Sequence, residues 1–191
     1  MKKTISVAPM MDCTDRHERY FLSLISQNIQ LYSEMIVSNA IIRGDRDKIL
    51  SFKKVKNKTI LQLGGSNPSE LAEACKISEQ YGYDEINLNL GCPSKKVQKN
   101  KFGACLMKEP TLVADCVNAM VNATKLPVSV KTRIGYNDIE NFEFLKNFIA
   151  TLKKAGTNKF IIHARRAILT KLTPKQNLSI PPLKYDFVYR L

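Results

Sequence analysis

The sequence predicts an α/β fold built on one parallel sheet of about six strands. Short apolar runs typical of strands alternate along the chain with longer amphipathic segments typical of helices. This alternation favours parallel strands joined by right-handed crossovers. Polar residues stand at or near the carboxyl ends of successive strands, the edge where (β/α) barrels carry their sites. With 191 residues, the chain is long enough for one domain with its own hydrophobic core.

The first half of the chain predicts three strands and two helices. The strands are the apolar runs at residues 5–8, 31–37 and 59–63. A helix is expected at residues 15–27, where apolar side chains recur at helical spacing. Asn67 and Pro68 suit the cap and first position of a second helix, which Gly82 ends.

The second half repeats the pattern with three more strands, at residues 85–90, 127–132 and 160–163. Helices are expected at residues 110–124 and 139–155, and Gly156 ends the second of them. The lysine-rich stretch after residue 91 and the proline-rich tail from Thr173 are expected to form loops.

Five polar residues lie at or near strand ends in this scheme: Gln62, Asn87, Asn89, Lys131 and His163. One such residue alone is more often structural, because polar side chains commonly satisfy loops and strand ends. Five of them on successive strands favour a functional site at one edge of the sheet.

The composition sets limits on the function. Lys and Arg number 30 against 17 Asp and Glu, which gives a net charge of +13. This excess fits a polyanionic partner, but 22 of the 30 cations are Lys, so a lysine-rich composition explains it equally well. No apolar run approaches the roughly 20 residues that span a bilayer, so no membrane partner is expected.

Five cysteines and two histidines argue against disulfide or zinc chemistry. The cysteine count is odd and no Cys-x-x-Cys pair occurs, so we expect neither a disulfide framework nor a metal site. Free thiols, and a start that passes directly into a strand, favour a cytoplasmic protein. Cys13, Cys75 and Cys116 are expected to be packing residues.

Seven short motifs occur in order along the chain. They are Ala8-Pro9-Met10, Leu61-Gln62-Leu63-Gly64-Gly65, Asn87-Leu88-Asn89-Leu90-Gly91-Cys92-Pro93-Ser94, Gly103-Ala104-Cys105-Leu106, Val130-Lys131-Thr132-Arg133-Ile134-Gly135, Ile162-His163-Ala164-Arg165 and Leu172-Thr173-Pro174-Lys175-Gln176-Asn177. Together they resemble the tRNA-dihydrouridine synthase family, and most closely its A subfamily. The resemblance covers essentially the whole chain.

The resemblance implies a TIM (β/α)8-barrel, of which residues 1–191 would form a partial FMN-binding catalytic domain. About six β/α units fit this length, because a complete barrel takes about 250 residues. We therefore expect the last strands, with the Gly-rich segments for the FMN phosphate, and the C-terminal helical domain to be missing. The implied activity is FMN-dependent reduction of uridine to 5,6-dihydrouridine at positions 20 and 20a of the tRNA D-loop, with NADPH as reductant. The complete protein that the resemblance implies is expected to be a monomer.

The resemblance also implies roles for individual residues. Cys92 would be the general acid that protonates C5 of uridine, while reduced FMN supplies a hydride to C6. A free thiol, with a pKa of about 8.5, is mostly protonated near neutral pH. The implied cofactor contacts are Pro9, Met10, Met11, Gln62, Lys131 and His163. The implied substrate contacts are Asn89, Arg165, Lys175 and Leu178, the last at a position where the subfamily typically has Arg.

The pattern around Lys131 supports a side chain that faces the barrel interior. Val128 and Val130 share one face of the strand, while Ser129 and Lys131 share the other. A cation there would face the N1–O2 edge of the flavin, where reduction leaves negative charge.

Several alternatives stay open at this point. Cys92 could be a small buried hydrophobic residue, and Cys105 could be the acid instead. The chain could also be a truncated, non-catalytic tRNA-binding fragment, or a different FMN-dependent barrel oxidoreductase such as a dihydroorotate dehydrogenase.

Overall fold

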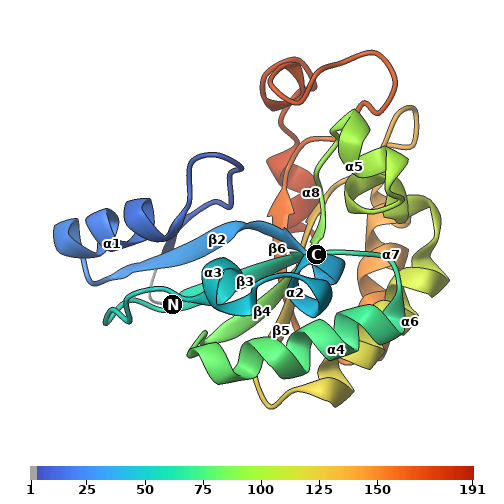
Figure 1. The fold of residues 1–191 in the computed structure, drawn as a ribbon. Helices are drawn as coiled ribbons and strands as arrows, with labels where there is room; N and C mark the ends of the chain where they lie inside the picture. The colour runs from blue at the N-terminus through green and yellow to red at the C-terminus, as the bar shows by residue number, and fades with distance from the viewer. Residues whose placement is uncertain (1–3) are drawn as a thin grey trace.

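In the computed structural model, which describes residues 4–191, six strands form a parallel sheet in the order β1 to β6. Each strand pairs with the next strand along the chain. The strands are β1 (Ile5–Val7), β2 (Ile29–Val37), β3 (Thr59–Gly64), β4 (Glu85–Leu90), β5 (Val128–Arg133) and β6 (Lys159–His163). The sheet curls as an open, partial barrel (Figure 1). The predicted TIM-barrel type with about six β/α units is thereby confirmed.

Helices connect the strands and cover the outer face of the sheet. The α-helices are α1 (Arg16–Ile25), α2 (Ser38–Arg43), α3 (Arg46–Leu50), α4 (Pro68–Ser78), α5 (Lys95–Lys99), α6 (Pro110–Ala123), α7 (Phe142–Lys154) and α8 (Tyr185–Tyr189). The 3-10 helices are η1 (Glu79–Tyr81), η2 (Gly103–Lys108) and η3 (Gln176–Leu178). None of the helices in residues 4–191 has the length and apolar composition needed to cross a bilayer.

The sequence predicted the four long helices, α1, α4, α6 and α7, but two predicted loops were wrong. The lysine-rich stretch after β4 contains α5 and η2, and the proline-rich tail contains η3 and α8. Helices α2 and α3 were also missed. Helices this short offer fewer than two turns of periodicity, and tertiary contacts rather than local pattern stabilise them.

Helix α4 shows how local sequence sets the boundaries of an element. The side chain of Asn67 accepts hydrogen bonds from the backbone N–H groups of Ser69 and Glu70, and Pro68 occupies the first position. The chain leaves η1 through Gly82, whose φ of 82° lies in the left-handed region. Both predicted boundary signals are confirmed.

The hydrophobic core lies between the outer face of the sheet and the helices. Leu61, Leu63, Leu88 and Val130 are fully buried there against α4 and α6, which run along this face in Figure 1. Ser129 faces the other side, where its hydroxyl accepts a hydrogen bond from Asn87. The predicted alternation of β5 is confirmed, and the inner face of the sheet is polar.

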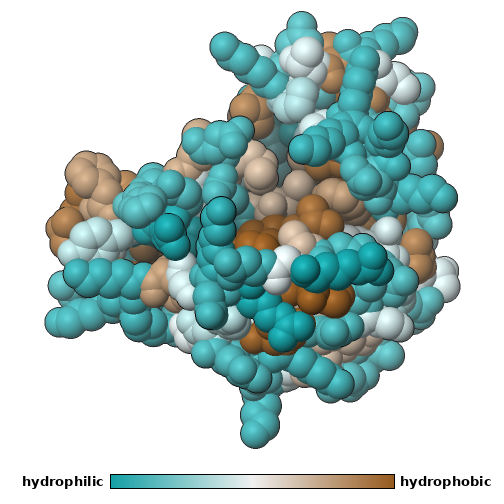
Figure 2. Space-filling view, in the orientation of Figure 1, coloured by the Kyte–Doolittle hydropathy of each residue, from teal (hydrophilic) through white to brown (hydrophobic). Residues whose placement is uncertain are grey.

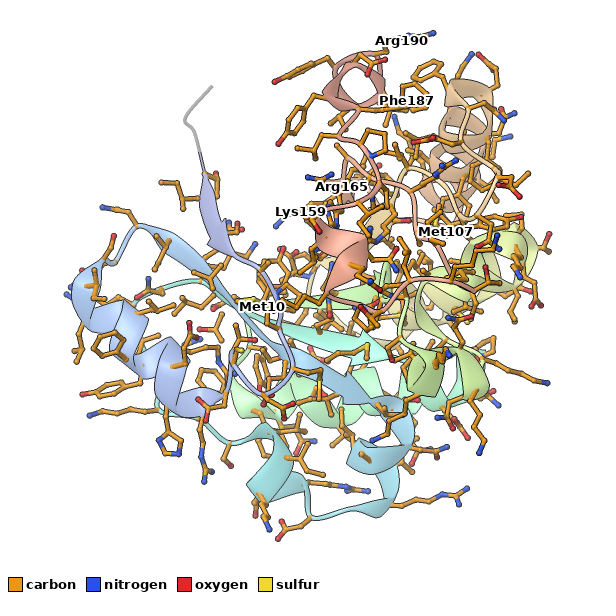
Figure 3. All side chains as sticks on the ribbon, turned by 90° about the horizontal axis from the view of Figure 1, so that it is seen from above. Met10, Met107, Lys159, Arg165, Phe187 and Arg190 are labelled. Atoms are coloured by element: carbon orange, nitrogen blue, oxygen red, sulfur yellow. The ribbon has the colours of Figure 1, made fainter. Side chains whose placement is uncertain are left out.

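Helices α1 and α8 lie at different margins of the described structure (Figure 1). Helix α1 lies beside β2, and its outward side carries hydrophobic surface, seen at the left of Figure 2. Helix α8 packs Phe187 edge-on against Phe142 of α7, with ring centroids 6.0 Å apart. Figure 3 shows Phe187 and Arg190 together, well away from Met10 in the loop after β1.

Candidate functional site

The carboxyl ends of β3 to β6 bring the predicted polar residues onto one face of the sheet. Strand register places Gln62 opposite Asn87 and Asn89 opposite Lys131. It also places Arg133 opposite His163. Because these positions are in phase, their side chains share the inner face of the sheet.

Three amide side chains at this face are joined by hydrogen bonds. Gln62 Nε2 donates to Asn87 Oδ1 at 2.8 Å, and Asn89 Nδ2 donates to Gln62 Oε1 at 2.8 Å. Asn89 Oδ1 in turn accepts from the backbone N–H groups of Gly91 and Cys92, at 3.1 and 3.0 Å. The amide cluster therefore fixes the start of the loop that carries Cys92.

The loop after β4 holds Cys92 half-buried at the carboxyl end of the strand. Its carbonyl oxygen accepts a hydrogen bond from the backbone N–H of Ala104 at 2.9 Å. Gly103 makes this approach possible: its φ is 75°, and a Cβ would lie 2.7 Å from the Cys92 oxygen and 2.5 Å from Val97 Cγ1. The Gly103 motif thus serves the geometry of the Cys92 loop.

Lys131 is a half-buried cation near the carboxyl end of β5. Burial lowers the pKa of its ammonium, the nearby Arg133 lowers it further, and a negative charge on the Cys92 sulfur acts in the opposite direction. Within residues 4–191, Lys131 forms no ion pair. A half-buried cation of this kind favours a bound anion in front of it.

His163 stands next to the same cations. Burial lowers its pKa to about 4, and the positive charges of Arg133, Lys131 and Arg165 add to the effect. At neutral pH the imidazole is therefore uncharged, and it can donate one hydrogen bond and accept another.

Arg133 belongs to the site although it was not among the predicted site residues. Its Nε donates to the Gly91 carbonyl at 3.0 Å, and its Nη1 donates to the carbonyls of Arg166 and Asn177, at 3.1 and 3.0 Å. Burial lowers its pKa to about 10, with Cys92 opposing the shift and Arg165 adding to it. Its position two residues after Lys131, on the same strand face, was the sequence signal that could have identified it.

Pro9, Met10 and Met11 lie in the loop after β1, the strand that borders the sheet on the side opposite β6. The Met10 N–H donates to Thr14 Oγ1 at 3.0 Å, and both methionine side chains are exposed. Within the described residues no hydrogen bond joins this loop to Gln62 or Lys131, so its predicted cofactor contact stays a prediction.

The predicted substrate residues occupy the segment after β6. Arg165 Nη1 donates to the carbonyl of Ser179 at 3.3 Å and also to that of Pro181, so this guanidinium fixes the backbone of its own segment. Lys175 and Leu178 are exposed. Their predicted contact with a nucleic acid stays a prediction.

The remaining cysteines differ in burial. Cys75 and Cys116 are buried, and burial raises the pKa of each thiol to about 12. Cys105 is half-buried with a raised pKa, again because of burial, and its thiol donates to the Phe102 carbonyl. Cys13 is exposed, so its predicted packing role was wrong.

A cavity elsewhere in the molecule does not coincide with the predicted site residues. A cavity of about 260 Å³ lies between α1, β2 and α3, and its lining includes Glu34 and Tyr83 but none of the predicted site residues. In residues 4–191 no group of three or more His, Cys, Asp or Glu side chains is arranged to hold a metal ion. The inner face at the carboxyl ends of β3 to β6 is therefore the candidate site.

Comparison with known proteins gives consistent matches. The family model described as dihydrouridine synthase (Dus) matches residues 6–191. The chain is 53% identical over 191 residues to a tRNA-dihydrouridine(20/20a) synthase of Shewanella oneidensis. It is 52% identical over 187 residues to the protein of that name in Xanthomonas campestris pv. campestris, and 51% over 187 residues to the one in Synechocystis sp.. These alignments cover 98 to 100% of the chain but only 56 to 57% of each relative's length.

Proposed function

The chain belongs to the dihydrouridine synthase family, and from that premise we propose that its inner face binds FMN and reduces uridine in tRNA to 5,6-dihydrouridine. The observation that carries the proposal is the position of Lys131. This half-buried cation lacks an acidic partner within residues 4–191 and shares the strand ends with the Cys92 loop.

The residues present at the site fit a flavin ring. Lys131 would face the N1–C2 carbonyl edge, where a reduced flavin carries negative charge. Gln62 and the uncharged His163 can each donate and accept hydrogen bonds, which suits the mixed donors and acceptors of the pyrimidine-like ring. FMN, when bound there, supplies the hydride that adds to C6 of uridine.

Cys92 would hold the proton that C5 of uridine receives. Its Sγ–H bond breaks as the new C–H bond forms at C5, which leaves a thiolate. The cations of Lys131 and Arg133 both interact with the Cys92 charge, so they would stabilise that thiolate. Asn89 anchors the backbone N–H of Cys92 and so orients the acid.

We infer that the substrate is tRNA rather than a free pyrimidine such as dihydroorotate. The relatives' names state tRNA and the positions 20 and 20a, and the chain's net charge of +13 suits a polyanion. The target uridine must leave its stack to reach Cys92. Arg165 and Lys175 would then contact phosphates near it, and NADPH would reduce the flavin.

The test is dihydrouridine formation on unmodified tRNA by the purified, FMN-reconstituted chain with NADPH. Cys92→Ala is expected to lower the rate by about 10² to 10⁴, the usual contribution of a general acid, with FMN binding unchanged. Cys105→Ala, a second half-buried thiol, is the matched control and should retain activity. Full activity in Cys92→Ala, or failure of the chain to bind FMN, would overturn the proposal.

A further inference from the structure

A buried carboxylate lies on the inner face of the sheet, at the end opposite the candidate site. Glu85 opens β4, and its side chain is fully buried. Its Oε2 forms ion pairs with Lys58 at 2.6 Å and Lys159 at 2.9 Å. Burial opposes ionisation, but hydrogen bonds from Lys159, Lys58 and Ser129 hold the pKa of the carboxyl below its ordinary value. Glu85 is therefore an anion near neutral pH.

A hydrogen-bond chain begins at this carboxylate. Because a carboxylate only accepts, the hydroxyl of Ser129 must donate to Glu85 Oε1, at 2.5 Å. The Ser129 oxygen has then committed its only proton, so it acts as acceptor toward Asn87 Nδ2, at 2.9 Å. Asn87 must in turn present its Oδ1 to the other side, where Gln62 donates.

At the other end of this hydrogen-bond chain, the donors and acceptors are fixed as well. The backbone N–H groups of Gly91 and Cys92 can only donate, so Asn89 must offer them its Oδ1. Its Nδ2 is then directed to Gln62 Oε1. Both ends of the hydrogen-bond chain therefore require the same orientation of the Gln62 amide.

We propose that Glu85 is a positioning residue, which fixes the orientation of the Gln62 amide through Ser129 and Asn87 and so holds Gln62 Oε1 toward Asn89. Its effect on cofactor affinity and turnover rests on the proposed function, because Gln62 is a proposed flavin contact and Asn89 orients the Cys92 loop. Glu85 itself touches neither the flavin nor the base in this scheme.

The decisive variants change a donor or acceptor in the hydrogen-bond chain and leave the side-chain shape nearly unchanged. Glu85→Gln is nearly isosteric but introduces a donor where only an acceptor stood. Ser129→Ala leaves Glu85 and both lysines in place but removes the hydroxyl that links them to Asn87. Lys58→Met is the matched control, because it removes one ion-pair partner without touching any amide.

The first measurement uses the flavin-free protein. The side-chain NH₂ resonances of Gln62 and Asn89 should move or split in Glu85→Gln and Ser129→Ala and stay in place in Lys58→Met. Unchanged resonances in both Glu85→Gln and Ser129→Ala would overturn the proposal. Ser129→Ala keeps the test valid if Glu85→Gln does not fold, because its buried ion pairs are intact.

The second measurement is FMN titration followed by single-turnover reduction of tRNA. Glu85→Gln and Ser129→Ala should weaken FMN binding about 3- to 10-fold relative to Lys58→Met, and Ser129→Thr, which restores a hydroxyl, should recover it. Altered amide resonances with unchanged FMN affinity and rate would overturn the role in cofactor binding. Failure of the wild-type chain to bind FMN would instead count against the proposed function, since the resonances report the amide orientation without flavin.

Discussion

At the scale of single residues, the site concentrates positive charge around one thiol. The positive charges of Arg133, Lys131 and Arg165 all lower the pKa of His163, and Lys131 and Arg133 also lie within reach of a charge on the Cys92 sulfur. A folded chain loses stability when a half-buried cation such as Lys131 has no acidic partner, and a bound anion would restore that stability.

The variant Lys131→Met separates the effect of the Lys131 ammonium on stability from its effect on FMN binding. Removing the half-buried ammonium should raise the unfolding free energy of the flavin-free chain by about 0.5–2 kcal/mol, because the desolvation cost disappears. The same change should weaken FMN binding about 10-fold, equivalent to about 1.4 kcal/mol. Urea unfolding and FMN titration measure the two effects. A loss of stability together with unchanged FMN affinity would make Lys131 a structural residue.

The lowered pKa of His163 predicts a dependence of stability on pH. The imidazole has a pKa of about 4 in the fold against an ordinary value of 6.5, so between these values the unfolded chain binds more protons. The contribution of His163 to the unfolding free energy is fully present above about pH 6.5. It falls by about 1–3 kcal/mol as the pH drops toward 4.

His163→Gln, which cannot be protonated, is the control for that pH dependence. Urea unfolding at several pH values between 4.5 and 7 should show a shallower loss of stability in the variant than in the wild type. Parallel curves for the two proteins would contradict the assigned pKa.

At the scale of elements, the Cys92 loop depends on a glycine in another segment. Gly103→Ala adds a Cβ at positive φ and forces it against Val97 and the Cys92 carbonyl. We expect a loss of about 2–4 kcal/mol in unfolding free energy, from backbone strain plus overpacking. Faster alkylation of Cys92 by iodoacetamide should accompany it, because the loop is displaced.

Gly82→Ala is the matched control for Gly103→Ala. Gly82 also has positive φ, but the nearest atom to its Cβ would be Lys54 Cδ at 3.9 Å, an ordinary contact. Gly82→Ala should lower the unfolding free energy only by the backbone strain, about 1–2 kcal/mol, and leave the reactivity of Cys92 unchanged. Equal losses of unfolding free energy in the two variants would show that the close contact with Cys92 does not contribute to stability.

The sequence predicted elements whose pattern is local and missed those that depend on distant partners. The four longest helices and all six strands follow from periodicity and from signals such as Asn67. Helix α5 has five residues, too few for a pattern. The anchoring roles of Glu85 and Arg133 arise from contacts 27 to 74 residues away along the chain, which a local pattern does not encode.

At the scale of the whole molecule, the sheet and its helices leave one hydrophobic margin uncovered. β1 and β6 border the described sheet on opposite sides, and near the β1 border α1, which lies beside β2, exposes Phe21, Leu24 and Ile25 by 61, 69 and 66%. Figure 2 shows this hydrophobic surface over α1. Apolar patches next to an open strand edge favour self-association.

Replacing two of these side chains should therefore raise solubility without weakening the fold. Phe21→Lys with Leu24→Lys removes apolar surface that packs against little, so the unfolding free energy should change by less than about 0.5 kcal/mol. Light scattering at increasing concentration should show less association than in the wild type. Leu178→Lys, at a side chain 59% exposed but far from α1 along the chain, controls for added charge alone. If it suppresses association equally, charge repulsion is responsible and the α1 margin is not the contact surface.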